Sequence, residues 1–199
     1  MNAGSAIVLA MPEPLRTRRL DLLPLCAALM TAIVDRDAPA VASGIGDCNL
    51  DDWDDAHAML RRRRGDLAGD ASLAPWVPRA IVRRADGVVI GHINFHSAPD
   101  PDYLRPYVAG AVESGYTIFS RYRRRGYATE ALLALIDWAH AAHGVVRIAL
   151  SVGAANLPSR IMAERLGFVA IGVWQDDEDG AEVVYSVSAA SLARIAAGQ

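Results

Sequence analysis

The sequence predicts an α/β fold: a central mixed β-sheet of about six to seven strands with helices on both faces. Hairpin-forming strands come first and a strand–helix alternation follows, a combination typical of mixed sheets covered on both sides. The chain has 199 residues, of which 52% are hydrophobic and 22% charged, as in a compact globular protein. We therefore expect one domain over residues 14–190, preceded by a flexible leader at 1–13 and followed by a tail at 191–199.

The first third of the chain predicts one strand and two helices. Residues 15–23 alternate as a strand, and Pro24 is tolerated in the first turn of a helix that runs to about Arg36. The small, glycine-rich stretch 38–49 is expected to be a loop. A second helix is expected over 50–64, because its acidic residues come first and its arginines last, which suits the helix dipole.

The remaining two thirds alternate between strands and helices. In chain order we expect strands at 77–84, 88–96 and 109–119, a helix at 127–143, a strand at 145–152, a short helix at 158–166, and strands at 168–174 and 182–187. The tripeptide Ala85-Asp86-Gly87 is a strong hairpin signal between the first two of these strands. Gly144 suits the left-handed position that closes a helix.

Composition and charge exclude several functions. The net charge of -3 gives no global positive field, so neither nucleic acid nor a membrane is expected as a partner. All 20 basic residues are arginine, which excludes a Walker-type GK[ST] loop, a Schiff-base lysine and a lysine general base. Two cysteines, Cys26 and Cys48, cannot form a disulfide framework and favour a reducing, cytoplasmic location.

Arginines are crowded before one helix. Arg121 and the run 123–125 precede Gly126, where the helix over 127–143 is expected to begin. A helix N-terminus exposes backbone N–H groups and about half a positive charge, which together attract anions. Gly126 lets the backbone approach an anion closely, and small Ala128 keeps bulk away. The stretch predicts a site for a pyrophosphate rather than for a DNA backbone.

These residues carry a family resemblance. Residues 123–128 resemble the R/Q-x-x-G-x-G/A signature of the GNAT superfamily of acyl-CoA-dependent N-acetyltransferases, and 113–118 resemble its central strand. Residues 156–159 with 166–168 are similar to its N-x-x-S…L-G-F segment. Residues 17–20 resemble the T-x-R-L opening of the branch that includes ribosomal-protein N-terminal acetyltransferases. The resemblance spans about 15–188, with its four motifs in the family's order.

The resemblance implies a GNAT-like sheet that binds acetyl-CoA as acyl donor, with no metal. The turn at 124–129 would hold the CoA pyrophosphate, and the central strand around 116–119 would pair with the pantetheine arm. The implied cofactor-binding residues are Ile118, Phe119, Arg123, Arg124, Arg125, Gly126, Tyr127, Ala128, Thr129, Asn156 and Ser159.

Transfer to nitrogen needs a neutral amine and a leaving thiol. Glu113, at the match to the family's central-strand glutamate, is the candidate base, acting through water; orienting the acceptor's ammonium group is the alternative. Many relatives place a thiol-protonating tyrosine where this chain has Ala163. Ser159 and Tyr127 are nearby possibilities, and a thiolate can also leave without an acid.

Polar residues on one strand are candidates for the acceptor site. His92, Asn94 and His96 share a face of the strand 88–96, and Tyr116 joins them as a substrate-binding candidate; ordinary hydrogen-bonded histidines are the alternative. Zinc is not expected, because no third ligand occurs at a recognisable spacing. The acidic run 176–180 does not fit an EF-hand register and is interpreted as a hairpin turn.

The leading hypothesis is an acetyl-CoA-dependent N-acetyltransferase acting by direct attack in a ternary complex. Its acceptor would be a primary amine, either a protein N-terminal α-amine or a small molecule. Alternatives are a longer acyl-CoA as donor, or a CoA-binding sensor without turnover, which Ala163 would favour. Nucleic-acid binding through 61–64 and 121–125 is disfavoured by the acidic balance and the few interleaved aromatics. Apolar helix surfaces are compatible with a homodimer.

Overall fold

The computed structural model describes residues 11–176 and 180–196, which form one mixed sheet with helices on both faces. The sheet has eight strands in the order β1-β2-β3-β4-β5-β6-β8-β7, one more than the upper limit expected. The strands are β1 Leu15–Arg16, β2 Leu20–Pro24, β3 Arg79–Arg83, β4 Val88–Phe95, β5 Ala111–Ile118, β6 Arg147–Gly153, β7 Val169–Asp176 and β8 Gly180–Ser188. The prediction of a mixed α/β sheet is confirmed.

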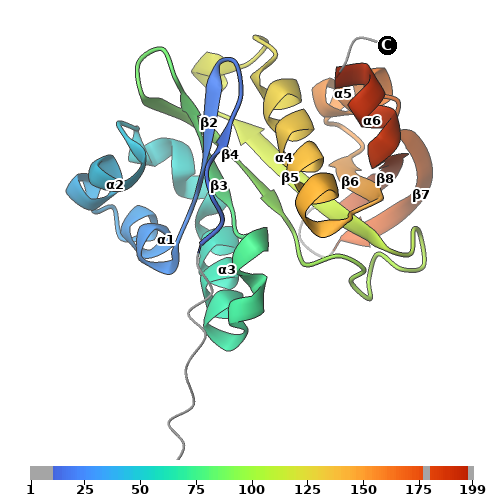
Figure 1. Ribbon diagram of the computed structural model, residues 1–199, viewed down its shortest axis with the longest axis horizontal. Coiled ribbons are helices and arrows are strands. Elements are labelled where there is room, and N and C mark those ends of the chain that lie inside the picture. The colour runs from blue at the N-terminus through green and yellow to red at the C-terminus, as the bar shows by residue number, and fades with distance from the viewer. Residues whose placement is uncertain (1–10, 177–179, 197–199) are drawn as a thin grey trace, which may run out of the picture.

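Six α-helices and three short 3-10 segments cover the described part of the sheet (Figure 1). The helices are α1 Ala27–Val34, α2 Ala38–Ile45, α3 His57–Gly69, α4 Tyr127–His143, α5 Leu157–Arg165 and α6 Ala189–Ala196; the 3-10 segments are η1 Leu50–Ala56, η2 Ala71–Trp76 and η3 Ser120–Tyr122. No helix in these ranges is long and apolar enough to cross a lipid bilayer.

Alternating side chains divide the core between the two faces of the sheet. Ile81 and Ile90 are buried with residues of α4, α5 and α6 on one face. Their neighbours Val82 and Val89 point the other way and are buried with residues of α1, α2, η1 and α3. Further along that second face, the loop 97–110 packs on β5, β6 and β8 through Leu104. Both faces are therefore covered, by helices on one and by helices plus a loop on the other.

The sheet opens at its only parallel strand pair within the described residues. β5 pairs with β6 from Ala111 to Glu113 and no further, whereas β4 stays paired with β5 from Ser114 to Ile118. The His96 N–H donates to a carbonyl of β5, and the Phe119 N–H donates to a carbonyl of β4. The backbone groups of the odd-numbered residues of β5 therefore face β4. By alternation, the backbone groups of Tyr116 and Ile118 face the gap toward β6.

Three predicted boundaries were wrong. Residues 38–45 form helix α2 rather than a loop: the Asp37 side chain accepts a hydrogen bond from the Ala40 N–H, and Val41 and Ile45 are buried one turn apart. The strand at 15–23 is split into β1 and β2 by a turn in which Thr17 bonds to Leu20. The helix expected over 50–64 begins as η1 and continues as α3 to Gly69.

The C-terminal residues are also more ordered than expected. Helix α6 over Ala189–Ala196 replaces the predicted tail. The Ser188 hydroxyl accepts a hydrogen bond from the Ser191 N–H, as an N-cap does. Leu192 is buried against the core that α4 covers, so the domain extends past residue 190. The acidic turn and the leader largely fall on 177–179 and 1–10, outside the described residues.

Candidate functional site

A hollow of about 830 Å³ lies where β5 and β6 separate, bounded by the end of β5, the arginine turn and the first turns of α4 and α5. It brings together most of the residues expected to bind a cofactor. These are Ile118, Arg123, Arg124, Gly126, Tyr127, Ala128, Thr129, Asn156 and Ser159, with Tyr116 beside them. Sequence reasoning missed six others that line the hollow: Thr117, Ser120, Tyr122, Pro158, Met162 and Arg165.

Two expected cofactor-binding residues do not line this hollow. Phe119 is 3% exposed and packs edge-on against Trp53, in the core under α1 and α3. Arg125 is exposed, and its carbonyl accepts a hydrogen bond from Arg19 at 3.0 Å. Phe119 precedes the turn and Arg125 lies within it, but neither side chain lines the hollow.

The arginine turn has a backbone suited to an anion. Gly126 (φ 77°) and Arg124 (φ 61°) are both left-handed, and Arg125 between them is not. Alternating backbone handedness points successive N–H groups into one concavity, and here the concavity opens at the N-terminus of α4. A left-handed arginine is strained, which is common at ligand sites. The Arg123 side chain turns back to donate from Nε to the Ile118 carbonyl at 2.8 Å.

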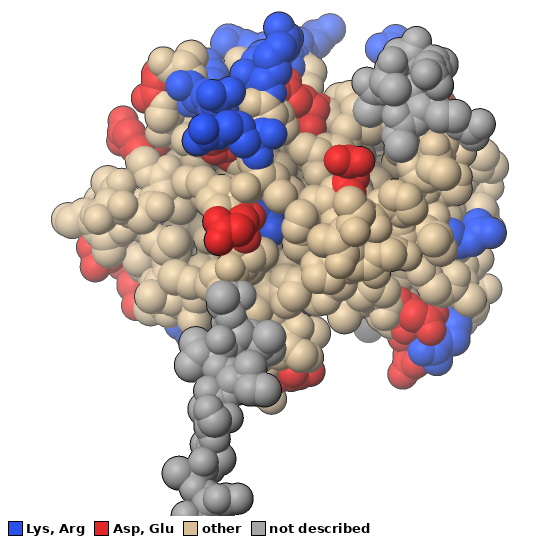
Figure 2. Space-filling view, in the orientation of Figure 1, with Lys and Arg blue, Asp and Glu red and all other residues tan. Residues whose placement is uncertain are grey.

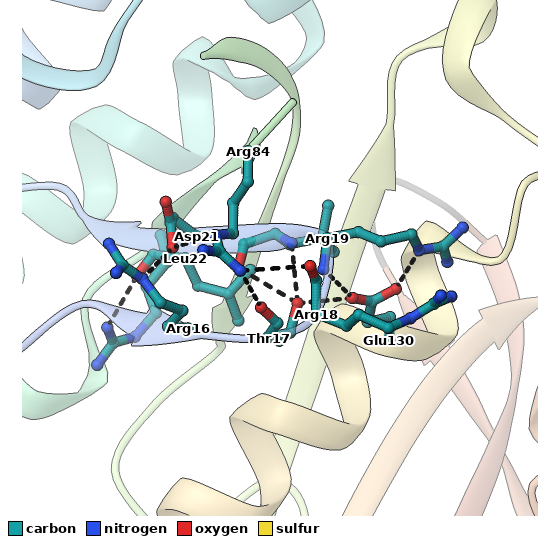
Figure 3. Close-up of polar contacts among 10 residues, drawn as sticks. Arg16, Thr17, Arg18, Arg19, Asp21, Leu22, Arg84 and Glu130 are labelled. Atoms are coloured by element: carbon teal, nitrogen blue, oxygen red, sulfur yellow. Dashed lines mark hydrogen bonds and ion pairs between the residues drawn. The ribbon is translucent and has the colours of Figure 1, made fainter. Parts of the chain in front are cut away.

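A buttress formed by Thr17, Arg19 and Glu130 holds the turn in place (Figure 3). Glu130, in the first turn of α4, accepts hydrogen bonds from the Thr17 hydroxyl at 2.6 Å, the Arg19 N–H at 2.8 Å and Arg19 Nε at 2.6 Å. Partial burial raises the pKa of Glu130, but these hydrogen bonds outweigh it and lower the pKa below its ordinary value. The T-x-R-L segment thus connects the β1–β2 hairpin to the turn that borders the hollow.

One buried hydroxyl in the hollow has no hydrogen-bond partner among the described residues. The Tyr116 Oη is buried and forms no hydrogen bond within the described ranges. Burial raises the pKa of Tyr116, and Ser159 on α5 lies close enough to oppose that shift. Ala163, where relatives place a tyrosine, is fully buried. Tyr127 is the other sequence candidate for a general acid. The Arg19 guanidinium lies over its ring, with Cζ 4.6 Å from the ring centre.

On the opposite face of the sheet, Glu113 lies in a cluster with His96 and Tyr103. The Glu113 side chain is 3% exposed; its Oε2 accepts a hydrogen bond from the Tyr103 hydroxyl at 2.7 Å and lies 3.3 Å from His96 Nδ1. Burial raises the pKa of Glu113, but contact with His96 and hydrogen bonds from Ser151 and Tyr103 outweigh it and lower the pKa to about 2. Glu113 is therefore a carboxylate at neutral pH.

The three polar residues expected on β4 separate in the structure. His96 is at the Glu113 cluster, and its side chain is 37% exposed. His92 is buried and stacks on Trp53 with ring centres 5.3 Å apart; burial lowers its pKa to about 4, so it is neutral. Asn94 is 4% exposed, and its amide bonds to the Phe95 carbonyl. Of the three, only His96 is placed to meet a ligand.

Tyr103 was not predicted from the sequence. It belongs to the loop 97–110, which carries no periodic pattern, and contacts Glu113 from ten residues upstream. Burial, followed by the nearby Glu113 charge, raises the pKa of Tyr103, so it stays a hydroxyl donor. No sequence signal pointed to Tyr103. Gly115 marks His96 instead, because a Cβ built at Gly115 would lie 2.5 Å from His96 Nε2.

Several arginines of the two clusters have local partners. Arg121 pairs with Asp52, Arg63 with Asp66 at 2.9 Å, and Arg64 Nη1 donates to the Thr31 hydroxyl. Figure 2 shows basic side chains gathered over the end of the molecule near the β2–β3–β4 strands, with acidic side chains interspersed, rather than a basic face. The described residues contain no group of three side chains that could hold a metal ion.

A single mixed sheet flanked by helices, open between β5 and β6, is the fold of an acetyltransferase. The chain belongs to the GNAT acetyltransferases: the model of the acetyltransferase (GNAT) domain matches residues 19–169. Members of this family transfer an acetyl group from acetyl-CoA to an amine acceptor.

Individual relatives agree with the family assignment. The chain is 28% identical over 159 residues to the uncharacterized N-acetyltransferase YjdG of Bacillus subtilis, covering 78% of this chain and 89% of the relative. An acetyltransferase structure from Agrobacterium tumefaciens superposes with a TM-score of 0.60 at 24% identity, covering 89% and 95% of the two chains. RimJ of Mycobacterium smegmatis, in complex with CoA-disulfide, superposes with a TM-score of 0.60 at 22% identity, covering 94% and 93%. The latter two likenesses concern the fold.

Proposed function

We propose that this chain is an acetyl-CoA-dependent N-acetyltransferase whose acceptor is a primary amine, either a protein N-terminal α-amine or a small molecule, and that the amine attacks the thioester directly in a ternary complex. One observation carries the proposal: the hollow at the β5–β6 opening is bounded by a helix N-terminus with a left-handed glycine and arginine. That combination suits a pyrophosphate attached to a long, narrow arm.

Each wall of the hollow has a task in this proposal. Backbone N–H groups from Arg124 to Thr129 hold the pyrophosphate, with charge from Arg123 and Arg124. The gap-facing backbone of Tyr116 and Ile118 pairs with the pantetheine arm, and an N–H there stabilises the oxyanion of the tetrahedral intermediate. Asn156 and Ser159 contact the cofactor from α5.

Tyr116 is the donor that we propose for the leaving thiolate. Ala163 supplies no hydroxyl, whereas the Tyr116 Oη is buried beside α5 without a partner among the described residues. We therefore propose that Tyr116 lies at the end of the hollow that holds the CoA thiol, and that its role is not limited to binding the acceptor. The Glu113 carboxylate, on the opposite side of the sheet opening, attracts the acceptor's ammonium group.

A pair of glycine substitutions tests the cofactor site. Gly126→Ala and Gly144→Ala place a Cβ at the two ends of the same helix, both at positive φ (77° and 67°), so both carry a similar backbone strain of about 1–2 kcal/mol. Only the first lies in the hollow. By calorimetry we expect Gly126→Ala to weaken acetyl-CoA binding about tenfold or more, because the added Cβ occupies the anion's approach, and Gly144→Ala to change it less than about twofold. Equal affinities for both variants would refute the assignment of the turn.

Turnover separates the enzyme from the CoA-binding sensor. Thiol release from acetyl-CoA with a panel of peptides, amino acids, polyamines and aminoglycosides should identify at least one acceptor. Binding of acetyl-CoA without release from any of them would favour the sensor, which Ala163 makes the specific alternative. Comparing acetyl-CoA with propionyl- and butyryl-CoA in the same assay tests the longer acyl donor.

A further inference from the structure

The cluster of His96, Glu113 and Tyr103 has the arrangement of a base with its positioning groups. We propose that His96 Nε2 accepts the proton of the acceptor amine, and that Glu113 and Tyr103 are positioning residues that orient the imidazole. The proposal rests on the acetyltransferase function and revises the hypothesis that Glu113 itself is the base.

Three separate elements build the cluster. His96 follows β4 directly, Glu113 lies in β5 at the last residue pair before the sheet opens, and Tyr103 reaches in from the loop 97–110. The His96 N–H of the backbone donates to the Glu113 carbonyl at 2.9 Å, so the two residues face each other across adjacent strands. Their side chains therefore share the face opposite α4.

The contact with Glu113 fixes which imidazole nitrogen carries the proton. An ionised carboxylate only accepts hydrogen bonds, so the His96 Nδ1, 3.3 Å from the Glu113 Oε2, is the protonated nitrogen of the neutral ring. Nε2 then keeps its lone pair. This nitrogen lies over Gly115, 2.5 Å from where a Cβ would stand, one residue before the gap-facing backbone of Tyr116.

Glu113 is poorly suited to take the proton itself. Its carboxylate is 3% exposed, already accepts a hydrogen bond from the Tyr103 hydroxyl and is in contact with His96. Contact with His96 and hydrogen bonds from Ser151 and Tyr103 lower the pKa of Glu113, whereas an efficient proton acceptor has a pKa near the working pH. The His96 side chain, by contrast, is 37% exposed. Imidazole is also the side chain that ordinarily changes charge between about pH 5 and 8.

The proton balance of the step is complete. His96 Nε2 takes one proton from the acceptor's ammonium group, and the resulting neutral amine attacks the thioester carbonyl. As the N–C bond forms and the C–S bond breaks, the second nitrogen proton is lost and the CoA thiolate gains one. His96 then releases its proton to solvent, so that each turnover yields an amide, a thiol and one proton.

Few other charges face His96. Besides Glu113 and Tyr103, the small hollow of about 230 Å³ at His96 is lined by Arg63 and Asp66 of α3. Those two form an ion pair with each other at 2.9 Å. Glu113 is therefore the unbalanced charge at the ring.

His96→Gln tests the base, with His143→Gln as the matched control. His143 is exposed at the end of α4 and contacts Trp76 and Trp138 rather than any member of the cluster. We expect His96→Gln to lower kcat about 10²–10⁴-fold at pH 7, the contribution typical of a general base, with acetyl-CoA affinity unchanged. Its rate should recover as the pH is raised and the amine deprotonates unaided, and free imidazole should partly restore His96→Ala. His143→Gln should retain the wild-type rate and pH profile.

A spectroscopic readout does not depend on turnover. Long-range ¹H–¹⁵N spectra of the wild-type protein at neutral pH should show the Nδ1-protonated tautomer for His96, and Glu113→Gln should lose that preference. Glu113→Gln should also lower kcat about tenfold or more, with partial recovery in Glu113→Asp, as expected of a positioning residue.

The outcomes distinguish the two proposals. Acetyl transfer that proceeds with an unchanged rate and pH profile in His96→Gln would overturn the role of His96 alone, as would an Nε2-protonated ring. Absence of acetyl transfer from wild-type protein to every amine tested would overturn the proposed function, and the role of His96 with it.

Discussion

The carboxylate of Glu130 should stabilise the fold and the cofactor turn together, which Glu130→Gln can measure. Glu130 receives three hydrogen bonds, two of them at one oxygen. A hydrogen bond to a charged group contributes about 1.5–3 kcal/mol, but the Gln carbonyl keeps part of this. The ion pair itself, with side chains 33% and 17% exposed, adds little. We therefore expect the free energy of unfolding at pH 7 to fall by about 2 kcal/mol, or Tm by roughly 4–8 °C.

The difference in free energy of unfolding between wild type and Glu130→Gln should depend on pH in a known direction. Because the folded-state pKa of Glu130 lies below its ordinary value, its ionisation stabilises the fold at neutral pH, and this stability is lost as the pH falls through the folded-state pKa. The gap between wild type and Glu130→Gln should thus narrow from pH 7 to about pH 3. Denaturant unfolding at several pH values measures it.

A control and a linked binding effect complete the test. Asp137→Asn removes a charge from an exposed position of the same helix and should leave stability within about 0.5 kcal/mol of wild type. Arg19, which Glu130 holds, also donates to the Arg125 carbonyl at the turn. Acetyl-CoA binding should therefore weaken several-fold in Glu130→Gln. A variant as stable as wild type at pH 7, or a gap that widens on acidification, would refute this reasoning.

Two further substitutions address buried polar groups that lack partners in the described part of the chain. Tyr116→Phe removes an unpaired hydroxyl, so the free energy of unfolding should stay constant or rise by up to about 1 kcal/mol. If the hydroxyl protonates the leaving thiolate, kcat falls about tenfold and the KM for acetyl-CoA is unchanged. An unaltered kcat would remove Tyr116 from the mechanism. Arg79 is fully buried, burial lowers its pKa to about 10, and its Nε and Nη2 lack partners. Arg79→Met should therefore raise the free energy of unfolding by about 1 kcal/mol or more in denaturant titrations; a loss of that size would show that its bonds to the Glu13 and Leu22 carbonyls outweigh the cost of burial.

The sequence predicted the parts of the fold that depend on local signals. The hairpin at Gly87 (φ 71°), the helix from Tyr127 to His143 and its closing Gly144 (φ 67°) all occur as expected, because each needs a residue type that few alternatives can replace. Helix α2 was missed although Asp37 and Pro39 begin it, because its small residues carry a weak pattern and Val41 and Ile45 gain their burial only from the assembled core.

The cofactor hollow was easier to predict than the acceptor side. The turn at 123–128 is one continuous segment, so its residues, all except Arg125, line the hollow together. The acceptor side combines residues from β4, β5 and a loop without periodicity, and nothing local distinguishes Tyr103 from its neighbours. His92 and His96 share a strand face, yet η1 covers the first with Trp53 and leaves the second accessible. The difference between them is made by the tertiary structure.

The absence of a side chain at position 115 constrains how related chains can change. A Cβ there would collide with His96 Nε2, so replacing Gly115 alone would displace the ring from Glu113, whereas replacing His96 alone would leave the glycine without a steric reason. Among homologues, positions 96 and 115 should therefore covary. Chains that keep histidine at 96 should keep glycine at 115, and chains with a bulkier residue at 115 should deprotonate their acceptors by another route.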